Sequence, residues 1–145
     1  MKILETDIQI DAPPSRVWSI LVDLQTYREW NPFIKSAKGN VSIGERLEVL
    51  MSPPNGKEMT FKPTVRSVIE HAEFSWLGRL GFPGIFDAEH IFTLSGNDKG
   101  CLLVQKEKFK GLLVPLLWSS LDRDTRAGFE RMNHALKERA ESENT

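Results

Sequence analysis

The longest helical pattern in the sequence lies near the C-terminus, at residues 112–139. Apolar or small residues recur there at every third or fourth position, as they do on the buried face of one long helix. They are Leu113, Leu117, Leu121, Thr125, Gly128, Phe129, Met132, Ala135 and Leu136. Because most of the preceding chain has the pattern of strands and turns, the sequence predicts an α+β fold in which one antiparallel sheet packs around this helix.

The middle of the helical stripe is small, with Thr125 and Gly128 set between larger residues. A glycine inside a helix costs about 1 kcal/mol relative to alanine, so this position needs a packing or functional reason. One reason is close contact with a strand, which the helix pattern alone favours. The other is room left beside the helix for a ligand.

The composition limits the kinds of protein that this chain can be. Its 145 residues suit a single domain, 1–145, with a sizeable core. Lysine and arginine number 19, aspartate and glutamate number 20, and a net charge of -1 gives no general attraction to nucleic acid. The N-terminus is charged where a signal peptide is apolar, and no apolar stretch is long enough to span a bilayer. We therefore expect a cytoplasmic protein without an integral membrane segment.

The cysteine and histidine residues do not predict a metal site. Cys101 stands alone, which excludes an intrachain disulfide and a cysteine-based metal framework. His71, His90 and His134 lack the spacing of metal ligands. We expect no metal and no cofactor.

The start of the chain predicts one strand followed by two short helices. Apolar and polar residues alternate over residues 4–10, as in a strand with one buried face. Pro14 suits the first turn of a helix that reaches about residue 24. Asp23 can cap a second short helix, which ends before Pro32 because the residue preceding a proline is disfavoured in a helix.

The chain from residue 33 to residue 109 is predicted as strands joined by turns. Segments 34–38 and 47–51 are predicted strands, and residues 59–69 are predicted as one strand in which Pro63 marks an edge or a bulge. Phe74 and Trp76 share one face of the next strand, and the glycine-rich segment 78–84 is predicted as a mobile turn. Turn-forming residues at 95–100 predict a hairpin between strands at 86–94 and 102–109.

Aromatic and polar side chains are expected on the inner face of the sheet, where they either pack a core or line a hydrated cavity. This set comprises Trp30, Phe33, Phe61, Trp76, Phe86, His90, Phe92, Gln105, Glu107, Phe109, Leu117 and Leu121. Core packing is favoured for Phe61 and Phe92.

Glu107 is the most informative member of this set. If Phe109 points inward, Gln105 and Glu107 point inward too, because alternate residues of a strand share a face. A buried carboxylate is costly unless it is paired or hydrated, and Arg79 or His90 could pair with it. We expect such a pair to keep Glu107 charged, so that it orients the polar end of a ligand. The alternative is a register shifted by one residue, in which Glu107 faces water.

Four stretches of the chain carry a family resemblance: residues 10–18 (IDAPPSRVW), 27–33 (YREWNPF), 89–94 (EHIFTL) and 105–113 (QKEKFKGLL). With the order strand, two short helices, six strands and long helix, they resemble the helix-grip fold of the START-like (SRPBCC) superfamily, in its polyketide cyclase/dehydrase and lipid-transport branch. The resemblance covers nearly the whole chain. It implies a seven-stranded antiparallel sheet curved around the C-terminal helix, with an apolar cavity between them. It also shifts the interpretation of Thr125 and Gly128 towards space beside that cavity.

The resemblance implies that the chain binds a small hydrophobic or amphipathic molecule, such as a lipid, a polyketide or an isoprenoid, for transport or sensing. The predicted ligand-binding residues are Trp30, Phe33, Phe61, Trp76, Phe86, His90, Gln105, Glu107, Phe109, Leu117, Leu121, Thr125 and Gly128. The alternative is a polyketide cyclase or dehydratase that uses Glu107, with or without His90, as its acid or base. A binding protein is favoured over an enzyme because no oxyanion-stabilising group is evident, and a co-chaperone-like module is a third hypothesis. We expect a monomer or a homodimer.

Overall fold

The computed structural model describes residues 1–142, and its elements follow the predicted order. They are β1 (Lys2–Ile10), α1 (Pro14–Leu21), the short 3-10 helix η1 (Leu24–Thr26), α2 (Tyr27–Trp30), β2 (Ile34–Lys38), β3 (Glu48–Met51), β4 (Met59–Phe61), β5 (Thr64–Ile69), β6 (Glu73–Leu80), β7 (Phe86–Asn97), β8 (Gly100–Lys110) and α3 (Val114–Glu141). Among these elements, no helix has the length and apolar character needed to cross a bilayer.

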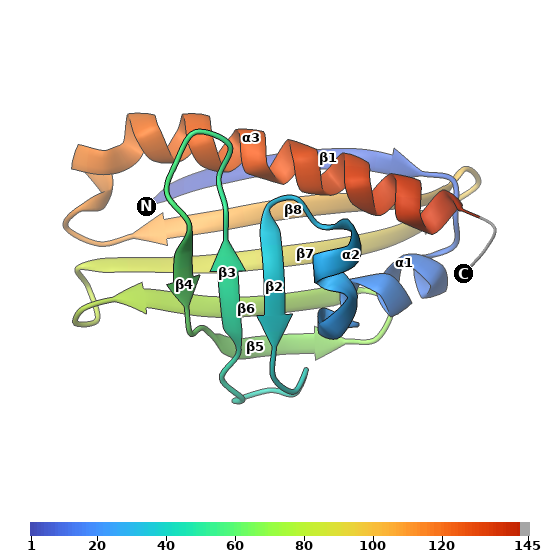
Figure 1. Ribbon diagram of the computed structural model, residues 1–145, viewed down its shortest axis with the longest axis horizontal. Coiled ribbons are helices and arrows are strands. Elements are labelled where there is room, and N and C mark those ends of the chain that lie inside the picture. Colours follow the sequence, from blue (N-terminus) through green and yellow to red (C-terminus); the bar gives the residue numbers. More distant parts are fainter. Residues whose placement is uncertain (143–145) are drawn as a thin grey trace.

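The strands form two antiparallel sheets. The larger has the order β1-β8-β7-β6-β5, and the smaller has the order β2-β3-β4. In Figure 1 the three short strands run across the long ones, and α3 lies along the long strands beside β1. The predicted α+β class, with two short helices after the first strand and a long C-terminal helix, is confirmed. The predicted single sheet of seven strands is wrong.

The chain passes from one sheet to the other at Pro63. Residues 59–69, predicted as one strand, form β4, which pairs with β3, and β5, which pairs with β6. Proline has no N–H for a strand ladder, so a continuous central strand through this position is disfavoured. The Pro63 carbonyl instead accepts a hydrogen bond from the N–H of Leu47 at 2.8 Å. Backbone bonds between Val65 and residues 44–45 join the two sheets at this corner.

The inner face of the hairpin β7–β8 agrees with the predicted register. Phe92 on β7 and Leu103 on β8 are fully buried, and His90 lies opposite Glu107 across the two strands. Glu107 therefore points inward, and the alternative register with Glu107 in water is wrong.

The helix α3 packs closely against the core only over its C-terminal half. Phe129, Met132 and Leu136 are fully buried. Between residues 114 and 127 the only buried residue is Val114, and Leu117 is 39% exposed. The first half of the predicted apolar stripe is thus only partly packed, and Leu121 is its member that still contacts the core.

Gly128 marks the point where the two halves of α3 meet. The Asn31 side-chain oxygen accepts the backbone N–H groups of Phe33 at 3.0 Å and Ile34 at 2.9 Å, which fixes the turn before β2. This turn places the Phe33 ring 5.8 Å from that of Phe129, in an edge-to-face contact. A Cβ atom at Gly128 would overlap the ring carbons of Phe33. The close contact with Phe33 therefore explains why residue 128 is glycine. The interpretation that Gly128 leaves space beside a cavity is wrong.

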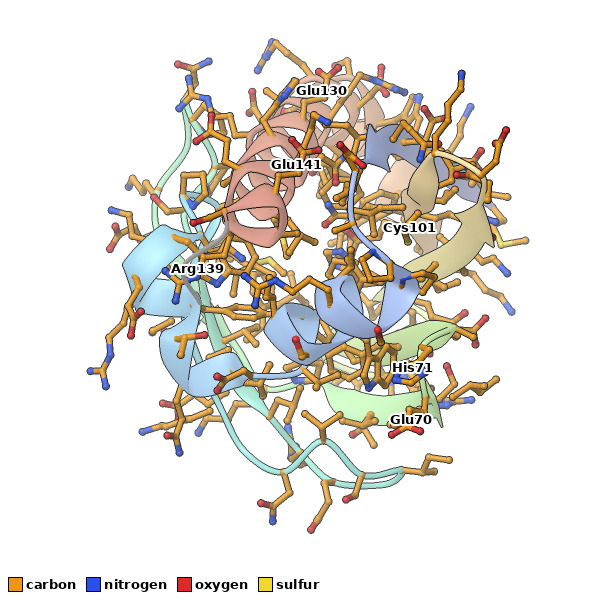
Figure 2. All side chains as sticks on the ribbon, turned by 90° about the vertical axis from the view of Figure 1, so that its right-hand side faces the viewer. Glu70, His71, Cys101, Glu130, Arg139 and Glu141 are labelled. Carbon is orange, nitrogen blue, oxygen red and sulfur yellow. The ribbon has the colours of Figure 1, made fainter. Side chains whose placement is uncertain are left out.

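The C-terminal end of α3 is fastened to the two short helices. Arg16 of α1 donates to the carbonyl of Arg139 at 3.1 Å, one of the helix-end carbonyls that lack an intrahelical partner. Arg139 pairs with Glu29 of α2 at 2.9 Å, and Glu141 accepts the N–H of Asp11 at 2.8 Å. Figure 2 views the molecule from this end, with Arg139 and Glu141 labelled. The helix is anchored here, at the end opposite its open half.

Replacing Gly128 by alanine should destabilise the fold, although alanine is the better helix former. Overpacking a filled core costs about 1–3 kcal/mol, which outweighs a propensity gain of about 1 kcal/mol at the upper end of that range. Urea denaturation should show a lower free energy of unfolding for Gly128→Ala, and adding Phe33→Leu should restore part of the loss. Gly78→Ala is the matched control, since the atom nearest to its new Cβ would lie 3.9 Å away. A Gly128→Ala protein as stable as the parent would contradict the close contact.

Candidate functional site

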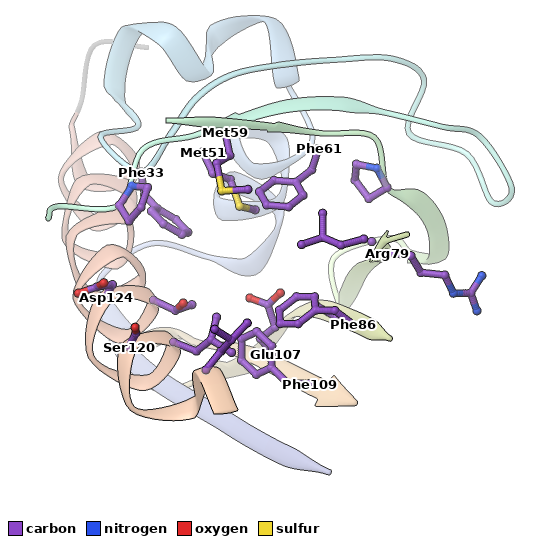
Figure 3. A pocket seen from close by; sticks show the side chains of 18 of the residues that line it. Phe33, Met51, Met59, Phe61, Arg79, Phe86, Glu107, Phe109, Ser120 and Asp124 are labelled. Atoms are coloured by element: carbon purple, nitrogen blue, oxygen red, sulfur yellow. The ribbon is translucent and has the colours of Figure 1, made fainter. Parts of the chain in front are cut away.

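A cavity of about 260 Å³ lies between the two sheets and the N-terminal half of α3. Figure 3 shows it from close by, with the helix on one side and strands of both sheets on the others. Its lining is mainly apolar: Phe33, Met51, Pro53, Lys57, Met59, Phe61, Pro63, Trp76, Gly78, Arg79, Leu80, Phe86, Ala88, Glu107, Phe109, Leu117, Ser120, Leu121, Asp124 and Thr125. The volume is close to the lower end of the range of about 300–1,000 Å³ found for small-molecule sites.

The structure brings together nine of the residues predicted to bind a ligand. Phe33, Phe61, Trp76, Phe86, Glu107, Phe109, Leu117, Leu121 and Thr125 all line the cavity. Phe61, for which core packing was favoured, is only half-buried and belongs to the lining. Their role in binding stays a prediction.

Four predicted residues lie outside the lining. Trp30 packs against Tyr27 with ring centres 5.2 Å apart, and Gly128 is covered by Phe33. His90 and Gln105 are fully buried behind the cavity floor. The strand patterns placed these last two on the correct face, but a face is wider than the cavity that it partly encloses.

Several lining residues were not predicted from the sequence. Met51 and Met59 come from the small sheet, whose position over the cavity required knowledge of the break at Pro63. Ser120 and Asp124 lie one position before Leu121 and Thr125, and an apolar helical stripe gives no signal for them. Flexible methionine side chains often line adaptable apolar sites, so the pair in β3 and β4 was the available signal.

The cavity reaches the surface near the start of α3. Its lining residues Leu80 and Leu117 are each 39% exposed. Beyond them Phe82 and Leu116 are still more exposed, and the N–H of Leu112 binds the carbonyl of Gly84 at 3.0 Å. The turns after β6 and β8 therefore lie together, and in Figure 1 both are at the left end of the molecule.

A second hollow, of about 390 Å³, lies on the other side of the small sheet. Although larger, it is lined by polar and charged groups that include Gln25, Arg28, Lys38 and Glu48. Such groups are hydrated on an open surface, and they offer little apolar area to a ligand. The apolar cavity is the better candidate.

Behind the cavity floor, four buried polar side chains form a hydrogen-bond network that joins α3 to three strands. Asn133 of α3 donates to Thr6 Oγ1 at 2.9 Å, and Thr6 donates to the carbonyl of Gln105 at 3.3 Å. The side-chain amide of Gln105 donates to Asn133 Oδ1 at 2.7 Å, and its Oε1 meets Nε2 of His90 at 2.7 Å. Asn133 was missed, although a polar residue between Phe129 and Leu136 on the buried stripe was a signal for it.

The network determines the tautomer of His90, and burial determines its charge. Since Oε1 of Gln105 can only accept, Nε2 of His90 carries the hydrogen and donates it. Burial lowers the pKa of His90 to about 4, against the smaller opposite effect of its bond to Gln105. The ring is thus neutral near pH 7, and Nδ1 has a lone pair but no partner among residues 1–142. This Nδ1 lies 4.0 Å from Oε1 of Glu107.

Glu107 is the acidic residue of the cavity floor. Its side chain is 11% exposed, and burial raises its pKa to about 8. The carboxyl group is therefore mostly protonated at neutral pH, when it can donate one hydrogen bond as well as accept. In Figure 3 it points into the cavity beside Phe86 and Phe109.

The expected charged pair at Glu107 is not found. Arg79 instead lies 3.3 Å from Asp87, its cross-strand neighbour, and points away from the cavity in Figure 3. His90 is neutral and too far away for a direct hydrogen bond. Without a cation, burial favours the uncharged acid, so the prediction of a charged Glu107 is wrong.

Within residues 1–142, no group of three or more histidine, cysteine, aspartate or glutamate side chains is arranged to hold a metal ion. The chemistry that the site offers is that of an apolar surface with one buried acid.

Comparisons with known proteins agree on the fold. A family model described as "Polyketide cyclase / dehydrase and lipid transport" matches residues 1–141. None of the curated proteins compared with the chain matches it.

Solved structures are similar over nearly the whole chain. Protein TTHA0849 of Thermus thermophilus has a TM-score of 0.78 at 17% identity, over 99% of this chain and 100% of its own. A START superfamily protein of Mycobacterium smegmatis has a TM-score of 0.73 at 18% identity, over 96% and 97%. The di-domain ARO/CYC StfQ of the steffimycin biosynthetic pathway has a TM-score of 0.68 at 10% identity, over 97% of this chain and 52% of its own. At these identities the likeness shows the fold alone.

The buried acid should make stability fall with pH in a defined window. Between the unfolded pKa of Glu107 and about 8, the folded state holds a proton that the unfolded state has lost, so raising the pH favours unfolding. His90 acts in the opposite direction, but only below its ordinary pKa of 6.5. From about pH 6.5 to 8, urea denaturation should show a loss of about 1–2 kcal/mol that is absent in Glu107→Gln. An equal pH dependence in both proteins would mean that Glu107 is charged.

Proposed function

The chain belongs to the polyketide cyclase/dehydrase and lipid transport family, and we propose that it binds a small hydrophobic or amphipathic molecule between its sheets and α3. The observation that carries the proposal is the cavity itself. Interiors of proteins are normally filled to the density of organic crystals, and an unfilled apolar space over half of a helix is costly to maintain. A ligand that fills this space would supply the missing contacts.

The position of the cavity supports exchange of such a ligand. The C-terminal half of α3 is held by Phe129, Met132 and the polar network, whereas Leu117 and Leu121 face the cavity in the other half. The apolar lining continues to the surface through Leu80 and Leu117. The ligand can enter there without breaking the packed half of the core.

A variant that fills the cavity tests this proposal. Gly78 lies between Trp76 and Leu80 on the lined face of β6, and a Cβ atom there would meet Pro63 at 3.9 Å and nothing nearer. Gly78→Leu should therefore fold and occupy the cavity. Overlap with a ligand costs about 1–3 kcal/mol, so binding of an apolar fluorescent reporter should weaken about tenfold or more, with Gly78→Ala in between. Leu77→Val, on the other face of the strand, is the matched control. Unchanged binding by a folded Gly78→Leu protein would place the reporter elsewhere.

Intrinsic fluorescence gives an independent measurement. Of the four tryptophans, Trp76 belongs to the cavity lining, whereas Trp18, Trp30 and Trp118 lie outside it. A bound molecule would contact Trp76 and should therefore change its emission. The change should disappear in Trp76→Phe and persist in Trp30→Phe and Trp18→Phe. A signal that requires Trp30 would place the ligand near α2.

A second candidate function is that of a cyclase or dehydratase. It is favoured by one observation, a protonated Glu107 in the cavity with the free lone pair of His90 nearby. A carboxylic acid so placed could protonate a carbonyl or a leaving hydroxyl group, which contributes about a hundred- to ten-thousandfold in rate. Turnover of a polyketide-like substrate that Glu107→Gln abolishes, while binding survives, would establish the enzyme and overturn the pure carrier.

A further inference from the structure

Some polar groups of the cavity lie at its rim and others lie in its interior. Arg79 and Lys57 lie at its rim: the Arg79 side chain is 47% exposed and paired with Asp87, and Lys57 is exposed on the turn between β3 and β4. Glu107 lies in the interior, and no protein hydrogen bond stabilises its charged form. In the part of the chain that the structure describes, the interior of the cavity therefore presents an acid without a cation.

The groups that face Glu107 from β1, β7 and α3 are neutral or negatively charged. On β7, His90 is neutral because burial lowers its pKa to about 4, and on β1 the cross-strand neighbour of Glu107 is Leu4. From α3, Ser120 and Asp124 line the same cavity, and the Asp124 carboxylate is paired with Arg123 at 2.9 Å. Thus one side of the cavity offers a hydroxyl group and a carboxylate, and the floor offers the Glu107 carboxyl group.

We propose that Glu107 is the specificity-determining residue of the cavity: its carboxyl group donates a hydrogen bond to an uncharged carbonyl oxygen at the polar end of the ligand, and the cavity rejects ligands that end in a carboxylate. This inference rests on the proposed binding function, which it narrows to one class of polar end group.

The rejection of carboxylates follows from the charges around the cavity. A ligand carboxylate beside Glu107 would leave water for an apolar space without a counterion. Lys57 could meet such a group only at the rim. A ketone oxygen has no charge to desolvate, and it fills the unused donor capacity of the Glu107 carboxyl group.

An eight-carbon ligand series tests this with chain length held constant. Octane, octan-2-one, octanoate and octylamine would each compete with an apolar fluorescent reporter near pH 6.5. Octan-2-one should bind about three- to tenfold more tightly than octane, the range expected for one net hydrogen bond, and octanoate should bind more weakly than both.

Two substitutions at one position separate the hydrogen bond from the shape of the site. Glu107→Gln keeps an N–H donor and should retain the preference for octan-2-one, whereas Glu107→Leu should lose it while octane affinity stays the same. In the parent, octan-2-one affinity should fall from pH 6.5 to 9 as the donor is lost, and in Glu107→Gln it should not. Lys57→Gln is the control for octanoate held at the rim.

The outcomes distinguish this inference from the proposed function. If octane and the reporter do not bind, both are overturned. If octane binds but octan-2-one gains nothing over it, or if Glu107→Leu keeps the ketone preference, only the role of Glu107 is overturned. Tight binding of octanoate that persists in Lys57→Gln would likewise overturn it, and so would octylamine as the tightest ligand, because an ammonium group requires a charged Glu107.

Discussion

The hydrogen bonds among Thr6, His90, Gln105 and Asn133 are the constraint on which the rest of this structure depends. Each of these side chains is buried, and each would cost about 1–3 kcal/mol if its partner were removed. Donors and acceptors alternate through the network, so all of its hydrogen bonds form in one arrangement of β1, β7, β8 and α3. The network thus fixes the helix on the sheet where apolar packing alone would tolerate small shifts.

The cavity begins where this fixed region ends. At Gly128 the ring of Phe33 closes the packed part of the core, and beyond it α3 passes over the cavity with Leu117 and Leu121 facing inward. Glu107 lies at the boundary, with the network on one side and open space on the other. Its protonation follows from burial: burial keeps His90 neutral, against the smaller opposite effect of the bond to Gln105, and the apolar lining disfavours the carboxylate.

Much of the architecture follows from local patterns. The alternation in the last strand placed Glu107 on the same face as Phe109, and the helical period placed Leu117 and Leu121 together on one face of the helix, because side-chain direction has a fixed period in each element. The pairing of the strands was harder to predict from the sequence. Pro63 was recognised as an interruption, but whether a proline bends a strand or transfers the chain to another sheet depends on the hydrogen bonds available elsewhere, here the N–H of Leu47.

The sequence by itself determined the α+β class, the long C-terminal helix and the shared face of Gln105, Glu107 and Phe109. Only the tertiary structure decided that Gly128 accommodates Phe33 rather than a ligand, and that Arg79 pairs with Asp87 rather than with Glu107. The reason is physical. Periodicity determines the face on which a side chain lies, whereas close packing and the charge of an acid depend on distances between segments far apart in the chain.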